Sequence, residues 1–252
     1  MIEISKKFKD DGFCIINTNQ KELITIINRK FDEVIISGNY HTNSKIYSYN
    51  DSPRIVDAYK VIPEIKDFAK SEQFRRIFNT LGFQDMLPFS NILFSYGSEQ
   101  PLHSDYVHHG TLPELLLVGV WTALEDIHEN SGELIVVPKS HKLDIFRYVD
   151  LGLKKPKSLP EIKNNYSKYE EYVKKILNEN NLSVVKLHLK KGESVIWNAN
   201  LLHGGAKIIN GNKTRRSFVI HYTFANAEKF YNPSFSFFKN PTDYNFKNLE
   251  FF

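Results

Sequence analysis

The second half of the chain alternates short runs of β-forming residues with turn residues, and this alternation restricts the possible folds more than any other feature. The runs span residues 91–96, 115–124, 133–137, 184–189, 194–197 and 217–224. Turn-forming residues separate them at 131–132, 191–192 and 210–212. Many short strands with this punctuation are typical of a sandwich, barrel or jelly roll.

The first third of the chain instead carries the helical period, with apolar residues three or four positions apart over 21–36 and 63–81. A polar stretch over 37–57 is predicted to be a long loop of the kind that forms lids. A third amphipathic pattern at about 160–181 predicts a helical insertion between strands. We therefore expect a mostly β fold with flanking helices.

The length of 252 residues is within the range of a single β domain, so we expect one domain over 1–252. Its parts would be an N-terminal helical and lid part over 1–88, a β core over 89–225 and a C-terminal tail over 226–252. The tail is rich in Phe and is predicted to pack on the core, although a homodimer interface is an alternative to a monomer.

Charge and cysteine content exclude several classes of function. The net charge of +4 arises from 33 basic and 29 acidic residues without a dense basic block, so we expect no nucleic-acid partner. The longest apolar run, 115–121, is far shorter than the roughly 18–20 residues of a membrane span. Cys14 is the only cysteine, and the N-terminus lacks the apolar region of a signal peptide. These features predict a cytoplasmic protein that has no membrane partner and does not insert into a membrane, although they leave peripheral contact open.

One pair of residues suggests a metal site. His103 and Asp105 are separated by a single residue, so on an extended segment both side chains point the same way. Two imidazoles and one carboxylate on one face of the ion are typical of non-haem Fe(II) oxygenases. His203, which follows a strand-like run, is the candidate third ligand. Taken alone, the pair could equally be a surface loop with a capping aspartate.

A strand-like run that begins shortly after His203 suggests a carboxylate site. Alternation places Arg215 and Ser217 on one face and Arg216 on the other. A guanidinium fork beside a hydroxyl suits a carboxylate such as the distal one of 2-oxoglutarate, whose other end can chelate iron. Two alternatives stay open: Arg215 could be a solvent-facing strand residue, and Arg216 could be the residue that binds.

Five motifs, taken in chain order, resemble the phytanoyl-CoA dioxygenase-like family of Fe(II)/2-oxoglutarate oxygenases. They are Asp-Gly-Phe-Cys-Ile-Ile at 11–16, Pro-Leu-His-Ser-Asp at 101–105, the segment 121–142, His-Gly-Gly at 203–205, and Arg215. The resemblance covers most of the chain and implies a double-stranded β-helix (jelly roll, cupin-like) core. It also implies that His103, Asp105 and His203 bind iron and that Arg215 and Ser217 bind 2-oxoglutarate.

The resemblance extends to two further positions and fails at two others. Trp121 matches a tryptophan beside the co-substrate, although it could equally be plain core, and Asn91 matches a polar position that can reach the co-substrate. Lys139 stands where the family usually has glycine, so this turn could differ. The loop 205–214 lacks the usual Gly-Pro-Asn.

The predicted function is a non-haem Fe(II)- and 2-oxoglutarate-dependent dioxygenase that uses O2 to hydroxylate a small-molecule substrate and releases succinate and CO2. The carboxylate of Asp105 favours hydroxylation over halogenation, while desaturation and ring closure stay open. A non-catalytic jelly-roll ligand-binding protein and a Zn(II) or Mn(II) enzyme of cupin type are the alternatives. His108 and His109 could face the substrate, but a pair of loop histidines is more often solvated. No motif identifies the substrate.

Overall fold

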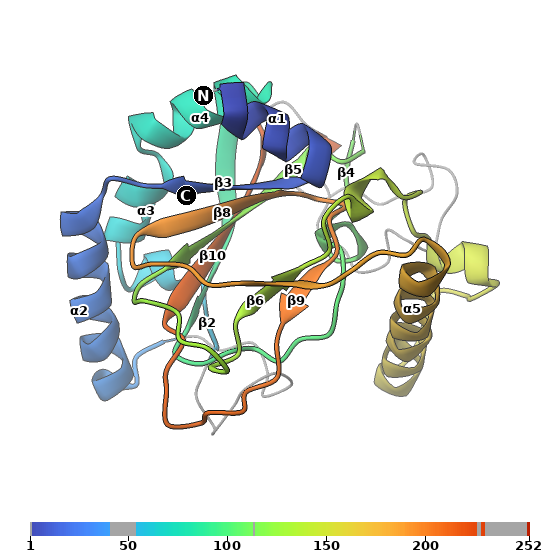
Figure 1. Ribbon diagram of the computed structural model, residues 1–252. Helices are drawn as coiled ribbons and strands as arrows, with labels where there is room; N and C mark the ends of the chain where they lie inside the picture. Colours follow the sequence, from blue (N-terminus) through green and yellow to red (C-terminus); the bar gives the residue numbers. More distant parts are fainter. Residues whose placement is uncertain (1, 41–53, 113, 226–227, 230–250) are drawn as a thin grey trace.

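The computed structural model describes residues 2–40, 54–112, 114–225, 228–229 and 251–252, and its centre is a six-stranded antiparallel sheet (Figure 1). The strand order is β1 (Phe13–Asn17), β8 (Glu193–Asn198), β5 (Leu117–Ala123), β10 (Ser217–Phe224), β3 (Met86–Phe94) and β2 (Arg54–Val56). The order differs from the order along the chain, so segments far apart in sequence become neighbours.

A smaller antiparallel sheet faces the large one. It contains β7 (Val185–Leu187), β6 (Leu134–Val136) and β9 (His203–Gly205) in that order. Val136 and Leu187 of this sheet share one hydrophobic cluster with Trp121, Trp197 and Val219 of the large sheet. A short ribbon pairs β4 (Thr111–Leu112) with β11 (Glu228–Lys229). Two facing antiparallel sheets are the arrangement predicted for a jelly-roll core.

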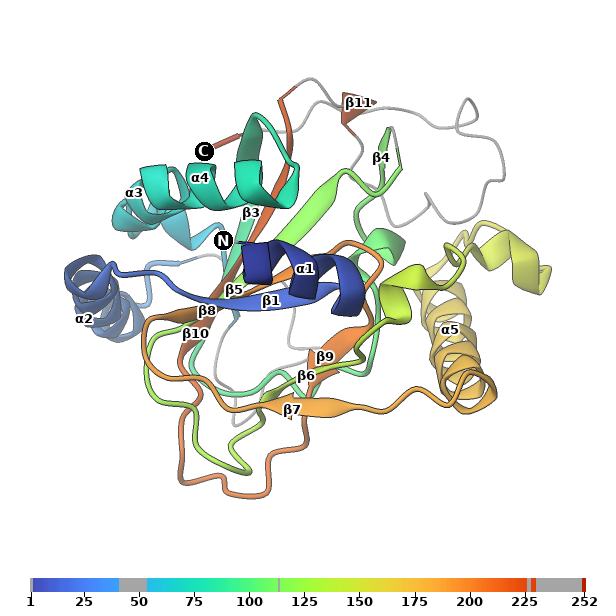
Figure 2. The same cartoon turned by 45° about the horizontal axis from the view of Figure 1, so that its top comes forward.

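Helices cover the other face of the large sheet (Figure 2). They are α1 (Ile2–Asp11), α2 (Lys21–Ser37), α3 (Glu64–Ala69) and α4 (Glu72–Leu81). The ring of Phe68 of α3 packs on that of Phe218 of β10. The ring centroid of Phe74 of α4 lies 6.3 Å from that of Tyr222 in the same strand. Because Phe218, Ile220 and Tyr222 alternate with residues that face the smaller sheet, β10 is buried on both sides.

The helical predictions are confirmed with one correction. The pattern at 21–36 forms α2, but the pattern at 63–81 forms two helices rather than one. The break occurs because Ser71 adopts an extended conformation (φ −61°, ψ 146°) and begins α4. Helix α1 was not predicted, and most of the predicted lid loop, residues 41–53, lies outside the described residues. Short 3-10 helices occupy Ala58–Lys60, Asp105–Val107, Ser140–Lys142 and Tyr148–Leu151.

Helix α5 (Leu159–Glu179) is the predicted insertion, and it supports the loop that carries His103 and Asp105. Ser158 caps its first turn by accepting a hydrogen bond from the Glu161 N–H. Its buried Tyr169 packs on Phe146, with ring centroids 4.6 Å apart. The Tyr169 hydroxyl accepts a 2.9 Å hydrogen bond from the N–H of Ser104, so the helix holds the residue between His103 and Asp105.

Of the predicted tail over 226–252, residues 226–227 and 230–250 lie outside the described residues. At its end, the ring of Phe252 stacks on Tyr59 with centroids 3.9 Å apart, and its N–H donates to the Pro88 carbonyl. Within the described part of the chain, no helix combines the length and the apolar character that crossing a membrane requires.

Lys139 adopts the left-handed conformation (φ 70°, ψ −6°) in the turn before the 3-10 helix at 140–142. This conformation is unfavourable for a side-chain-bearing residue but not for glycine. We expect Lys139→Gly to raise the free energy of unfolding by about 0.5–1 kcal/mol in urea denaturation. Lys142→Gly, in the adjacent helical turn, should lower it by a similar amount. A loss of stability in Lys139→Gly would contradict the strain assigned to this turn.

Candidate metal centre

Local backbone geometry directs His103 and Asp105 to the same side. Ser104, between them, is extended (φ −96°, ψ 146°), and a 3-10 turn begins at Asp105. His103 also forms an isolated antiparallel bridge with His203 of β9, in which each N–H donates to the other's carbonyl at 2.9 Å. Residues that are directly opposite in an antiparallel pair project to the same side. The three side chains therefore meet.

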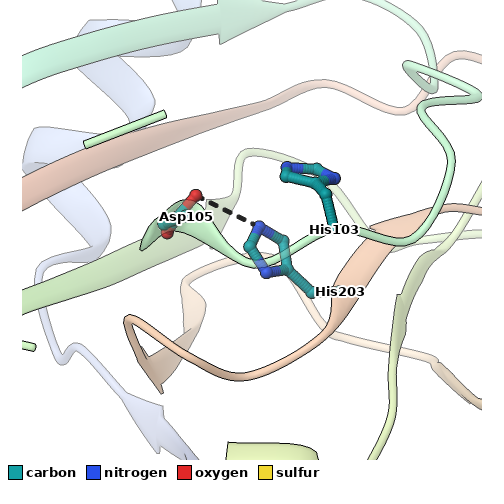
Figure 3. Close-up of side chains that lie close together, drawn as sticks. All are labelled: His103, Asp105 and His203. Carbon is teal, nitrogen blue, oxygen red and sulfur yellow. Dashed lines mark ion pairs between the residues drawn. The ribbon is translucent and has the colours of Figure 1, made fainter. Parts of the chain in front are cut away.

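The side chains of His103, Asp105 and His203 form a compact buried group (Figure 3). One potential ligand atom from each lies within 4.8 Å of the other two. Nε2 of His203 is 3.5 Å from Oδ1 of Asp105, and the two imidazole centroids are 4.5 Å apart. Each residue is at most 5% exposed. The predicted ligand residues are thus brought together by segments almost a hundred residues apart.

Backbone carbonyls orient both imidazoles. Nδ1 of His103 lies 2.8 Å from the Pro101 carbonyl, and Nδ1 of His203 lies 3.0 Å from the Leu201 carbonyl. Because a carbonyl only accepts hydrogen bonds, each Nδ1 carries the proton and each Nε2 presents a lone pair. The lone pair of His103 Nε2 accepts a 3.1 Å hydrogen bond from the Gln100 side-chain amide, which a metal ion would displace. Metal-binding histidines commonly donate the proton of their other ring nitrogen to a carbonyl in this way, which fixes the orientation of the ring.

The electrostatics of the group also suit a cation. Burial lowers the pKa of His103 and of His203, so both rings are neutral near pH 7. Burial alone would raise the pKa of Asp105, but His203 and His221 outweigh it and hold that pKa well below its usual value. Two neutral imidazoles and one carboxylate are the protonation states that metal binding needs. They are also the donor set of non-haem Fe(II) sites.

The group opens into a cavity of about 260 Å³ between the two sheets. Strands β2, β3, β5, β8 and β10 of the large sheet and the loop before His103 contribute its walls. The polar lining residues are Arg54, Ser90, Ser98, Gln100, His103, Asp105, His108, His109, His203, Arg215 and His221. Its apolar walls include Phe94, Trp121 and Trp197.

Arg215 is buried in the cavity wall at 2% exposure. Its guanidinium lies over the rings of Phe94 and Trp121, 5.5 and 5.3 Å from their centroids. Its Nη2 makes one long hydrogen bond, 3.4 Å, to the Tyr96 carbonyl, and its Nε has no partner. Among the described residues no carboxylate lies within ion-pair distance of it. Burial and the nearby Arg54 lower the pKa of Arg215 to about 9, which still leaves it charged near pH 7.

Of the two neighbours of Arg215 considered in the sequence, Arg216 lies where alternation predicts, whereas Ser217 does not reach the cavity. Arg216 faces the helices, where its Nη2 is 2.6 Å from Asp32 Oδ1 and its guanidinium lies over Phe31. Ser217 is fully buried, but its hydroxyl lies 3.3 Å from the Arg215 carbonyl, and it is not among the residues that line the cavity.

Trp121 lines the cavity, whereas Asn91 does not. The side chain of Asn91 is fully buried, and its Nδ2 donates to the Val219 carbonyl at 3.0 Å. Ser90 and Ile92, on either side of it in β3, line the cavity instead. The expectation that Asn91 reaches the co-substrate therefore conflicts with its place in the strand.

Of the two alternatives for His108 and His109, the structure supports the one in which they face the substrate space, because both are half-buried and line the cavity. The N–H groups of both residues donate to the Asp105 carbonyl, at 2.9 and 2.8 Å, which folds them back toward the metal group. Burial lowers the pKa of His108 to about 4. A helical turn straight after the His-Ser-Asp motif was the signal that would have indicated this position.

The profile of the family described as Phytanoyl-CoA dioxygenase (PhyH) matches residues 8–217. The chain belongs to the phytanoyl-CoA dioxygenase family. Human peroxisomal phytanoyl-CoA dioxygenase is 33% identical over 138 residues, which cover 52% of this chain and 35% of that protein. The mouse protein is 26% identical over 182 residues, 65% of this chain and 49% of that protein. The matched part is thus half or less of these relatives.

Solved structures support the predicted fold. The 2-oxoglutarate-dependent carbocyclase SnoK from nogalamycin biosynthesis has a TM-score of 0.70 at 16% identity, over 92% of this chain and 87% of that one. EctD from S. alaskensis with bound Fe has a TM-score of 0.66 at 16% identity, over 87% and 75%. The family member described here shares their fold, and the predicted mostly β jelly-roll core with flanking helices is confirmed.

The cavity histidines whose pKa values are lowered predict a loss of stability at acidic pH in the metal-free protein. Unfolded histidines bind protons below about pH 6.5, whereas His103, His108, His109 and His203 have lowered pKa values when folded. The free energy of unfolding should therefore fall as the pH drops from about 6.5 toward 4, by up to about 1.4 kcal/mol per pH unit for each histidine.

Urea denaturation at several pH values, after removal of metal with a chelator, measures the slope of the free energy of unfolding against pH. His108→Gln should make it shallower, and His188→Gln, at an exposed position, serves as the control. An unchanged slope in His108→Gln would show that this ring does not stay neutral in the folded protein.

Proposed function

We propose that this protein is a non-haem Fe(II)- and 2-oxoglutarate-dependent dioxygenase that hydroxylates a small-molecule substrate and releases succinate and CO2. His103, Asp105 and His203 would hold the iron, and Arg215 would bind the distal carboxylate of 2-oxoglutarate. Their donor types, burial and protonation states fit Fe(II).

The observation that carries the proposal is the buried guanidinium of Arg215 in the same cavity as the metal group. A buried charge is costly unless an opposite charge compensates it. None of the described ion pairs involves Arg215, so an anionic ligand is the natural partner. A ligand that carries one carboxylate for this guanidinium and a second group for the metal matches 2-oxoglutarate.

The chemistry that Fe(II) would supply here is a coupled oxidation, in which one atom of O2 enters succinate as CO2 leaves and the other enters a substrate C–H bond. The protein's own residues position and shield this reaction. His103, Asp105 and His203 would hold the metal, Arg215 and Trp121 would hold the co-substrate, and the cavity walls would shield the reacting groups. Asp105 as a ligand favours hydroxylation, while desaturation or ring closure would use the same residues.

The substrate is proposed to be small and to form hydrogen bonds. The cavity of about 260 Å³ is near the lower limit of small-molecule sites. His108 contributes a neutral ring whose Nε2 has no partner among the described residues, so it can bond a substrate hydroxyl or amide. We do not extend the CoA ester in the relatives' name to this chain, because its only candidate phosphate-binding cluster is Lys154, Lys155 and Lys157.

Two other functions are compatible with the fold. A ligand-binding protein without turnover would bind 2-oxoglutarate but form no succinate. A Zn(II) or Mn(II) enzyme would have no use for the Arg215 carboxylate site. Measuring succinate with Fe(II), Mn(II) and Zn(II) in turn separates the three, because only the proposed function gives Fe(II)-dependent succinate.

We also propose that the protein forms one domain over 1–252, is a monomer or homodimer, and is cytoplasmic without nucleic-acid partners. Cys14 fits a structural role, since it is 1% exposed and burial raises the pKa of its thiol to about 12. The curated relatives, in contrast, are named as peroxisomal.

We expect Arg215→Ala to raise the apparent KM for 2-oxoglutarate by about a hundredfold or more, because it cuts a charge-assisted pair in a buried site. Arg215→Lys should recover only part of the loss, since an ammonium lacks the two-pronged geometry. Arg216→Ala, which loses the ion pair to Asp32 on the opposite face, is the matched control and should change KM little. Succinate formation over a 2-oxoglutarate titration is the readout. No effect at Arg215 would refute the co-substrate site.

Separate alanine substitutions of His103, Asp105 and His203 should each abolish Fe(II)-dependent succinate formation, because three protein ligands are the facial set that holds the ion. Far-UV circular dichroism should show that each variant remains folded. Full activity in any one of them would remove that residue from the proposed ligand set.

A further inference from the structure

We propose that Trp197 is a positioning residue for the metal-binding carboxylate: its indole N–H holds one oxygen of Asp105 so that the other faces the metal. This inference rests on the proposed function, since it assigns a role around the same metal centre. The hydrogen bond joins residues of β8 and of the loop after β3, and no sequence motif indicates it.

The geometry divides the two oxygens of Asp105 between different roles. Trp197 Nε1 donates to Oδ2 at 2.7 Å, a short distance for an N–H donor. His221 approaches the same oxygen, with its Nε2 at 3.5 Å. Oδ1 instead lies 3.5 Å from Nε2 of His203, on the side where the three potential ligand atoms converge. The indole donor therefore occupies Oδ2 and leaves Oδ1 for the metal.

The indole itself is held by close packing. Its ring lies 4.4 Å from the ring of His203 at an interplanar angle of 35°. On its other side it crosses Gly119 of the neighbouring strand β5, which is its direct register partner. A Cβ atom at Gly119 would lie only 2.3–2.6 Å from three indole atoms. Glycine at this position is therefore what allows the indole to lie across the sheet and reach Asp105.

Tryptophan suits this role because its indole nitrogen only donates hydrogen bonds. It cannot compete for the metal, and it cannot reverse the direction of the bond to Asp105. Both residues are nearly fully buried, so water cannot readily replace the donor. Outer donors to metal ligands typically change metal affinity by about 10–100-fold when they are removed.

The test uses Co(II) as a probe metal and measures its dissociation constant by calorimetry. Trp197→Phe keeps an aromatic ring beside His203 and removes only the donor, and we expect it to weaken Co(II) binding about 10–100-fold. In an Asp105→Ala background, the same substitution should cause little further loss, because its effect passes through the carboxylate. An unchanged affinity, or an equal loss in both backgrounds, would overturn the proposal.

A second measurement avoids any variant at Trp197 that fails to fold. The chain has two tryptophans, so the ¹⁵N-labelled protein has two indole N–H signals in NMR spectra. The Trp197 signal should exchange slowly with solvent in the wild type, whereas in Asp105→Ala it should move upfield and exchange faster. The Trp121 signal, assigned with Trp121→Phe, should change less. If neither indole signal responds to loss of the carboxylate, the proposed bond does not exist.

The outcomes also separate this inference from the proposed function. If the wild type forms Fe(II)-dependent succinate but Trp197→Phe binds Co(II) normally, only the role of Trp197 is wrong. If Co(II) binding depends on Trp197 but no succinate forms, the positioning role stands and the dioxygenase proposal fails. If the wild type binds no Co(II), the metal centre itself is refuted.

Discussion

The backbone bridge between His103 and His203 is the constraint on which the candidate site depends. Its two 2.9 Å hydrogen bonds join the loop after β3 to β9 of the smaller sheet. This contact requires close approach of two backbones, and the glycines after His203 permit it. A Cβ at Gly204 would lie 2.6 Å from the Gln100 carbonyl oxygen, and one at Gly205 would lie 2.8 Å from the Glu99 nitrogen. In the His-Gly-Gly motif, the histidine is thus the candidate metal ligand, and the two glycines leave room for the backbone of the loop before His103.

A second constraint is that strand β10 is packed on both faces. Its helix-facing residues are uniformly apolar or aromatic, whereas the opposite face carries His221, and Arg215 lines the cavity just before the strand begins. Buried polar groups beside an otherwise apolar strand are costly unless a partner or a ligand compensates them. Arg215 and His221 therefore indicate which face lines the cavity.

Much of the fold and the triad could be predicted because the relevant signals are local. Periodicity located α2, α5 and most strands, and regular alternation placed Arg215 and Arg216 on opposite faces correctly. The Asn91 expectation came from the resemblance alone. The local pattern could not check it, because β3 is buried on both faces and its pairing with β10 shifts between His221 and Tyr222. The break between α3 and α4 at Ser71 was also not predicted, because the spacing of apolar residues continues across it without interruption.

Trp197 illustrates what lay beyond any local pattern. In sequence it ends an apolar run and looks like core, and it is indeed 2% exposed. Its role depends on a partner 92 residues away and on the absence of a side chain at Gly119 of the adjacent strand. Each of the three residues is unremarkable alone, because a buried indole, a carboxylate and a strand glycine have many ordinary uses. Only the strand order, which puts β5 beside β8, places Gly119 against Trp197 so that the indole can orient the carboxylate of Asp105.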